Sequence, residues 1–419
     1  MMRWTTPETG DAIVDIVTSI ARYADKLYNA SDAVAMGALT ANYSGKQPTL
    51  KTLDQINAAI DFAGKEVNTL PGHPGDYLRA MLNSHRHLVR WLAGDKSLSY
   101  HTAVKNILEV DLKEIPKDNF LRMGEDIDKI LTDKGCKGTP DEKIKQWQAD
   151  MRIPADQVIA VAHKYIGRAK ERTLRDIIHE FPEDKIDSIN PITNVFFAGL
   201  SEYLGDYTGR LTFNIDFPWN SAYFAWVLAH EGYPGHHVYY TLWDYMFRKG
   251  ELPLEASYVL INSPINCLFE GVPNIGIQIL GWEDPNQDTP EISPQEKADI
   301  ILAHKIGVLQ CAYETNGSYF YNVEGRSKEQ VIAYMRSNGW YSEIEAENCF
   351  TYFSHPYKRI YYPCYYYGYW IMQRSYDLFA YDRLPEYYDM IYKTPQTNST
   401  LIKAVEAATG KPFAPFAGV

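Results

Sequence analysis

The stretch AHEGYPGHHVY contains three histidines and a glutamate within eight residues. His230 and Glu231 come first, and His236 and His237 follow a proline and a glycine. A helix with the pattern His-Glu-x-x-His binds one zinc ion through two histidines on one face and places the glutamate beside the metal-activated water. Here the residue four positions after His230 is Pro234, so an unbroken helix would not bring a second histidine to the same metal.

Pro234 and Gly235 are residue types that distort a helix, because proline removes a hydrogen-bond donor and glycine relaxes the backbone. One interpretation is a zinc-binding helix that these residues open, so that a distant histidine comes round to His230. The alternative is a helix that ends before the proline, followed by a turn with solvated histidines and no chemistry. A third ligand is available in LFEGVPN, where Glu270 stands near a predicted helix start.

A predicted strand leads into this motif. Residues 209–217 (GRLTFNIDF) alternate apolar and polar side chains, which is typical of a half-buried strand, and 221–231 form a predicted helix with Asn220 or Ser221 as its N-cap. Peptide-binding enzymes pair an edge strand with their substrate. We therefore expect this strand to lie at the edge of a sheet beside the active-site cleft, with Asn214 in contact with substrate.

Helical periodicity dominates the rest of the chain. The predicted helices lie at residues 51–66, 76–94, 141–152 and 154–180, and later near 256–281, 293–322, 327–337, 343–353 and 364–380. They predict a mainly α-helical, multi-helix protein with one small β-sheet. We expect an N-terminal helical region at residues 1–190 and a metal-binding catalytic region at residues 191–419.

The composition of the chain argues against some classes of binding partner and indicates its cellular compartment. The net charge is −12 and no long basic cluster occurs, which argues against nucleic acid and anionic membranes as partners. The five cysteines never have CxxC spacing, so we expect reduced thiols. No signal peptide or membrane-spanning stretch is evident, and a cytoplasmic protein is the expectation. The 32 tyrosines fit a polar cleft and a helical core equally well. The oligomeric state is not indicated.

The HEGYPGHH segment resembles the large bacterial family known as domain of unknown function 885, which is placed among the gluzincin-type zinc metallopeptidases. The hallmark of that family is HE-x-x-P-G-H-H followed by an E-G-W segment, and this chain has Val272 where the tryptophan stands. The resemblance runs from about Thr208 to the C-terminus and includes looser matches at residues 325–331 and 358–369.

The resemblance implies a gluzincin-like fold and one Zn²⁺ per chain, with His230, His236 and Glu270 as ligands and Glu231 as general base. His236 is favoured over His237 as the second histidine ligand, because it follows the glycine as in the related HE-x-G-H peptidases. His237 is then expected to donate to the substrate or to a ligand.

Related enzymes supply a further oxyanion donor from a C-terminal helix. The resemblance points to Tyr369, with His355 as a second candidate, and Arg359 could bind a substrate carboxylate bidentately. Alternatively, the tyrosine-rich segment is an aromatic helix packed in the core, and Arg359 lies at the surface without binding substrate.

We therefore expect a zinc-dependent hydrolase that cleaves an amide bond in a short peptide or a peptide-like small molecule. Two rival hypotheses use the same fold. One is a metal-dependent lyase, cyclase or other biosynthetic enzyme acting on a small metabolite. The other is a non-catalytic binding protein, against which an intact Glu231 argues, since a binder needs no base beside the metal.

Overall fold

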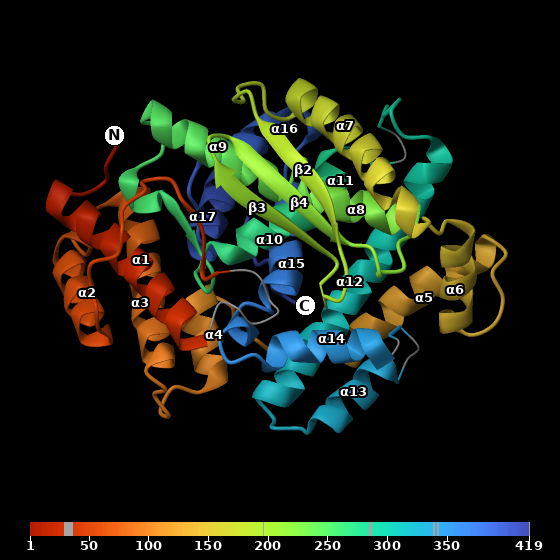
Figure 1. The fold of residues 1–419 in the computed structure, drawn as a ribbon, viewed down its shortest axis with the longest axis horizontal. Coiled ribbons are helices and arrows are strands. Elements are labelled where there is room, and N and C mark those ends of the chain that lie inside the picture. The colour runs from red at the N-terminus through yellow and green to blue at the C-terminus, as the bar shows by residue number, and fades with distance from the viewer. Residues whose placement is uncertain (29–36, 196, 285–286, 338–339, 342, 419) are drawn as a thin grey trace.

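The structure is a computed structural model that describes residues 1–28, 37–195, 197–284, 287–337, 340–341 and 343–418 (Figure 1). Helices make up most of these residues, and the strands form two small sheets. The prediction of a mainly α-helical protein with a small sheet is confirmed. No helix within the described ranges is long and apolar enough to cross a membrane.

The N-terminal part of the chain folds into consecutive helices that pack on one another. Thr52 and Thr139 each form a capping box at a helix start, in which the threonine hydroxyl and the side chain three residues later accept each other's backbone N–H. The helices are α1 (Pro7–Tyr28), α2 (Leu53–Val67), α3 (Gly72–Leu92), α4 (Tyr100–Leu108), α5 (Lys117–Asp133), α6 (Pro140–Asp150) and α7 (Val158–Asp176).

The larger sheet has three strands in the order β2-β4-β3. Strand β2 (Lys185–Ile192) runs parallel to β4 (Thr208–Asn214), and β3 (Gly199–Gly205) runs antiparallel to it. The strand predicted at residues 209–217 is therefore β4, which lies in the centre of the sheet. The prediction that it forms the edge was wrong, because both of its sides are hydrogen-bonded, and β3 is the edge strand that borders the pocket described below.

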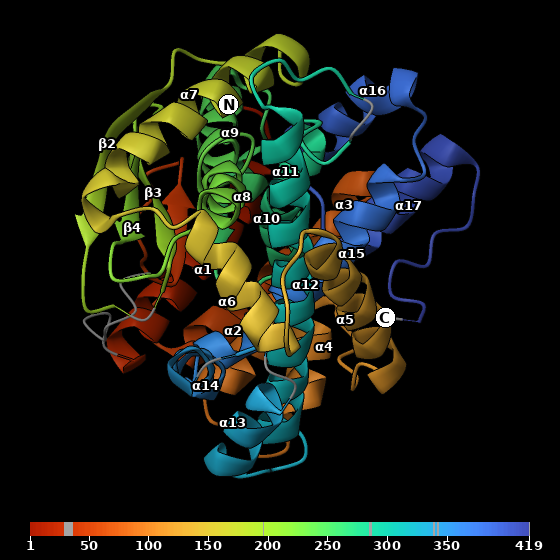
Figure 2. The same cartoon turned by 90° about the vertical axis from the view of Figure 1, so that its right-hand side faces the viewer.

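The second half of the chain supplies the remaining helices. A long central helix, α12 (Pro294–Asn322), runs through the molecule and contacts α5, α8, α13, α14 and α15 (Figure 2). The others are α8 (Ser221–Glu231), α9 (His236–Lys249), α10 (Asn266–Asn274), α11 (Gly276–Ile279), α13 (Lys328–Arg336), α14 (Glu343–Ser354), α15 (Cys364–Tyr376), α16 (Leu384–Tyr388) and α17 (Asn398–Thr409). Short 3-10 or π turns occur at residues 155–157, 254–256, 358–360, 381–383 and 389–393.

The helix predicted near residues 256–281 is replaced at its start by a strand. Strand β5 (Tyr258–Leu260) pairs antiparallel with β1 (Leu39–Asn42), and this tertiary pairing overrides the local helical pattern. The two regions expected on either side of residue 190 are thus joined by a shared sheet. They also share one hydrophobic core, and β2 runs across the boundary.

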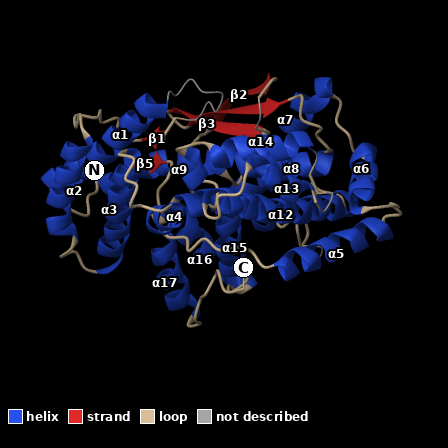
Figure 3. Ribbon diagram, turned by 90° about the horizontal axis from the view of Figure 1, so that it is seen from below, coloured by secondary structure: helices blue, strands red, loops and turns tan. Residues whose placement is uncertain are grey.

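The three-stranded sheet lies along one side of the molecule, and most of the helices pack on one side of this sheet (Figure 3). Helices α8 and α9 both contact β3, and α9 also contacts β4. This layer carries the HEGYPGHH segment between the sheet and the buried helices.

Helix α10 is buried over its whole length and crosses α15 at very short distance. A Cβ added at Gly271 would lie 2.2 Å from the carbonyl oxygen of Gly368, and one added at Gly368 would lie 2.3 Å from the carbonyl oxygen of Cys267. The two backbones can approach this closely only because both positions lack a side chain. This crossing places Glu270 of α10 against the tyrosines at the start of α15.

We expect Gly271→Ala to destabilise the fold, because the new methyl group would overlap backbone that cannot move away. Overpacking of this kind costs about 1–3 kcal/mol or more. Gly64→Ala is the matched control, since an added Cβ meets nothing within 4 Å in the interior of α2, and alanine favours a helix by about 0.5–1 kcal/mol over glycine. Thermal unfolding should give a lower midpoint for Gly271→Ala only; equal midpoints would contradict the role of the crossing.

Candidate metal centre

The HEGYPGHH segment forms two separate helices joined by a four-residue turn. Helix α8 begins at an Asn220 cap, whose Oδ1 accepts the Tyr223 N–H at 2.8 Å, and it ends at Glu231. Helix α9 begins at His236. The helix thus ends before the proline, as the second interpretation of the sequence expected. The turn nevertheless brings the histidines together instead of leaving them in solvent.

Two glycines permit this turn. A Cβ added at Gly235 would lie 1.8 Å from the carbonyl oxygen of His230, and one at Gly232 would lie 2.3 Å from Cδ1 of Ile166. The Gly235 N–H donates to the carbonyl of Ala229 at 3.1 Å, which folds the chain back onto the end of α8. As a result, His236 starts α9 next to His230, with ring centroids 4.7 Å apart.

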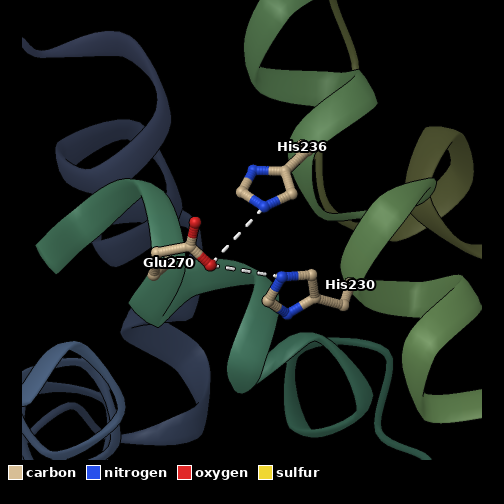
Figure 4. A group of neighbouring side chains, drawn as sticks. All are labelled: His230, His236 and Glu270. Atoms are coloured by element: carbon tan, nitrogen blue, oxygen red, sulfur yellow. Dashed lines mark ion pairs between the residues drawn. The ribbon is translucent and has the colours of Figure 1, made fainter. Parts of the chain in front are cut away.

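His230, His236 and Glu270 converge from three helices (Figure 4). One ligand atom from each residue lies within 4.8 Å of the others. The Glu270 Oε2 atom is 3.3 Å from His230 Nε2 and 3.6 Å from His236 Nε2, while the Tyr361 hydroxyl donates to Oε1. Although burial opposes ionisation, the two histidines hold the pKa of Glu270 well below its ordinary value.

The donor set fits a divalent transition metal. Two imidazole nitrogens and one carboxylate oxygen, with a fourth position open, are the ligand pattern of catalytic zinc sites. Glu270 Oε2 is buried and accepts no hydrogen bond from the described residues, although it faces both imidazoles. A buried carboxylate oxygen without a donor is costly, and a cation between it and the imidazoles removes that cost.

Glu231 lies beside this cluster and faces a pocket. The pocket has an empty volume of about 1210 Å³, including its mouth, and both His230 and Glu231 line it. Burial raises the pKa of Glu231 to about 7, opposed by the charge of His230 and by a hydrogen bond from the Ser201 backbone on β3. A group with this pKa exchanges protons near neutral pH, as a general base must.

His237 does not face the pocket, so its expected contact with substrate was wrong. Its side chain is 1% exposed, and Nε2 lies 2.7 Å from Oδ2 of Asp184. Tyr233 also donates to Asp184, and Lys170 forms an ion pair with it at 2.7 Å. Asp184 thus ties both ends of the turn to the loop before β2. The sequence contained no local spacing that pointed to this aspartate.

The other residues expected to bind or act on substrate have structural contacts. Asn214 is buried; its amide donates to the Val195 carbonyl at 2.9 Å, and its Oδ1 accepts the Asp216 N–H at 3.0 Å. The Arg359 guanidinium stacks on Trp91 at 4.7 Å. Neither Asn214 nor Arg359 is among the described residues that line the pocket. Both side chains are thus used in contacts within the fold.

Two predicted catalytic side chains also lie away from the pocket wall. The His355 Nδ1 accepts the backbone N–H groups of Tyr357 and Lys358, both at 3.1 Å, and so stabilises a turn. Tyr369 packs edge-on against His304, with ring centroids 5.4 Å apart. Neither His355 nor Tyr369 lines the pocket within the described ranges.

A different tyrosine, Tyr365, lies one helical turn before Tyr369 and reaches the pocket. It lines the pocket with His230 and Glu231, and its backbone carbonyl accepts the Asn274 amide at 3.1 Å. Burial, the carboxylates Glu270 and Glu231 and the neighbouring Tyr352 raise its pKa well above the ordinary value, so the phenol stays protonated and can donate. The tyrosine run at residues 361–369 pointed to this region, but not to the residue.

Comparisons with known proteins bear on the fold. No protein-family model matches the chain, and no curated protein matches it. A solved structure from Colwellia psychrerythraea, described as a candidate lipoprotein, is similar with a TM-score of 0.57 and 16% identity over 87% of this chain. The match covers 65% of that protein, so this chain spans about two thirds of its length. A candidate lipoprotein of unknown function from Shewanella oneidensis gives a TM-score of 0.49 at 16% identity, covering 93% of this chain and 70% of its own.

The two adjacent histidines give opposite expectations for metal content. We expect His236→Ala to lose zinc, because one of the three converging ligands is removed. His237→Ala should retain one zinc per chain but unfold at lower temperature, since a buried hydrogen bond to Asp184 worth about 1–3 kcal/mol is lost. Elemental analysis of the dialysed proteins tests this. Zinc loss from His237→Ala with retention in His236→Ala would reverse the assignment.

Proposed function

We propose that this chain is a zinc-dependent hydrolase that cleaves an amide bond in a short peptide or a peptide-like small molecule. One observation carries the proposal: the ligand atoms of His230, His236 and Glu270 lie within 4.8 Å of one another, and the adjacent Glu231 faces a pocket. The resemblance of HEGYPGHH to the motif of gluzincin-type peptidases supports the same reaction class.

His230, His236 and Glu270 would hold the zinc ion, which when bound lowers the pKa of water and polarises the substrate carbonyl. Glu231 accepts a proton from the attacking water and passes it to the leaving nitrogen as the C–N bond breaks. An intact base beside the ligands supports an enzyme over a non-catalytic binding protein.

Tyr365 is the donor for the oxyanion that develops on the substrate carbonyl. Tyr365 lines the same pocket as His230 and Glu231, and its raised pKa keeps the phenol proton in place. Strand β3 borders the pocket on another side only at its start, where Gly199 and the preceding Ala198 line it. Only a short part of this edge is left to pair with an extended chain, which favours short substrates.

We expect Glu231→Gln to reduce hydrolysis by about 10²–10⁴-fold, the usual contribution of a general base. It should retain one zinc per chain, because Glu231 is not one of the three converging ligands. Cleavage of a panel of short peptides, followed by mass spectrometry together with elemental analysis, measures both quantities. Glu202→Gln is the control, since Glu202 pairs with Arg210 on the outer part of the sheet. Undiminished hydrolysis by Glu231→Gln would sink the mechanism.

A second pair of variants tests the tyrosine. Tyr365→Phe should lower kcat by about 10²–10³-fold with little change in KM, as expected when one donor to an oxyanion is removed. Tyr369→Phe should be close to wild type, because its ring packs on His304 outside the pocket. Steady-state kinetics on the best peptide of the panel decides; equal effects of the two variants would remove Tyr365 from the reaction.

A further inference from the structure

The pocket next to the metal centre holds a second carboxylate that the proposed reaction does not use. Glu314 of α12 accepts hydrogen bonds from Tyr341 (2.7 Å) and Cys349 (3.2 Å) on Oε1 and from Tyr362 (2.7 Å) on Oε2. All three donors are neutral side chains. A carboxylate has about four acceptor sites, so one position on Oε2 remains for a further donor.

The ionisable side chains that line the pocket are mainly acidic. Glu231, Glu314 and Glu345 line it, whereas none of the lining residues in the described ranges is a lysine or arginine. His230 is the sole basic side chain on that described wall, and it belongs to the metal centre. When ionised, these carboxylates give the wall a negative potential that concentrates cations and disfavours anions.

The remaining wall is aromatic. The same pocket that Glu231 and Glu314 line is also lined by Phe217, Tyr223, Trp226, Tyr341, Tyr352 and Tyr362. The faces of such rings attract ammonium groups, most strongly where water is excluded. Tyr341 and Tyr362 combine both effects, because their hydroxyl groups aim the carboxylate while their rings line the pocket.

We propose that this pocket recognises a positively charged amino group of the substrate, with Glu314 as its counter-ion and the aromatic side chains as its cage. The inference rests on the proposed function, because it assigns the substrate class of the same pocket: an amide whose carbonyl faces Glu231 and whose ammonium group reaches Glu314. A free peptide N-terminus and a lysine-like side chain share this chemistry.

Alternatively, Glu314 holds α12, α14 and the start of α15 together and binds nothing. The two roles differ in one measurable property. A structural Glu314 is indifferent to the charge of a bound molecule, whereas a counter-ion discriminates between an ammonium group and a neutral group of the same shape.

Binding of matched probes to the wild-type protein measures this discrimination. Phenylalaninamide is compared with N-acetyl-phenylalaninamide, and N-acetyl-lysinamide with N-acetyl-norleucinamide, by calorimetry at a pH where the amines are protonated. Each pair differs in one positive charge, and the two pairs separate an N-terminal from a side-chain amine. The titrations are repeated on EDTA-treated protein, so that an amine bound directly by zinc is recognised as such.

We expect at least one charged probe to bind about tenfold or more tightly than its neutral partner, the usual size of a charge-assisted hydrogen bond, with and without zinc. Glu314→Gln should abolish that preference, whereas Glu347→Gln, an exposed residue of α14 paired with Lys328, should keep it. Equal binding within both pairs on the wild-type protein would overturn the inference, even if Glu314→Gln does not fold.

This experiment separates the inference from the proposed function. A charge preference in a protein that cleaves no peptide supports the cation site and removes the hydrolase. Peptide cleavage without any charge preference removes the cation site and leaves the hydrolase intact. A preference that disappears with EDTA assigns the amine to the metal and overturns the role of Glu314.

Discussion

The cluster of His230, His236 and Glu270 depends on a backbone approach that leaves no room for a side chain at residue 235. The carbonyl oxygen of His230 lies where the Cβ of any other residue would be, 1.8 Å from its ideal position. Because the chain folds back at this point, a histidine six positions after His230 reaches the same side of the cluster. An ideal helix would have rotated it away. The turn then needs external support, which Asp184 supplies through Tyr233 and His237.

A second close approach brings in the carboxylate. Gly271 and Gly368 allow α10 and α15 to cross, and the residues beside the crossing form the rest of the site. Glu270 directly precedes Gly271, and Tyr365 lies on α15 shortly before Gly368. The Tyr361 hydroxyl donates to Oε1 of Glu270. The close packing of α10 on α15 thus sets the positions of Glu270, a candidate metal ligand, and of Tyr365, which lines the pocket. An added Cβ at either glycine would overlap the facing backbone.

The residue types of the centre could be predicted from the sequence, but not all of their positions. His230, Glu231 and Glu270 follow from the spacing of the motif and a nearby acidic residue. The choice between His236 and His237 depends on the torsions of a turn, which spacing alone does not define. Tyr365 and Tyr369 differ by one helical turn, so only the crossing with α10 decides which of them meets the pocket. The contact of Asp184 is long-range and leaves no local pattern.

The wrong prediction that residues 209–217 form an edge strand also results from long-range contacts that leave no local pattern. The alternation of residues 209–217 correctly predicts a strand, but whether a strand lies at the edge or in the centre depends on its partners. Strand β4 gained a parallel neighbour in β2 and an antiparallel one in β3. Asn214 then became the residue that closes the turn after the sheet, where its amide satisfies backbone groups. Buried polar side chains are hydrogen-bonded, and the partners of Asn214 are backbone groups of this turn.

The accumulation of carboxylates around one pocket has a cost for folding. Glu231, Glu314 and Glu345 line it and Glu270 lies behind His230, while the described wall contains no lysine or arginine. Ionising these groups is costly, because burial removes their hydration and raises the pKa of both Glu231 and Glu314. Their retention is understandable when cations bind there, since ligands that bind only the folded state offset the cost by mass action. A metal at one end and an ammonium group at the other would each relieve part of the same negative field. On the proposed function, the carboxylates that cost stability in this pocket would be the groups that bind cations, as expected where function is maintained at the expense of stability.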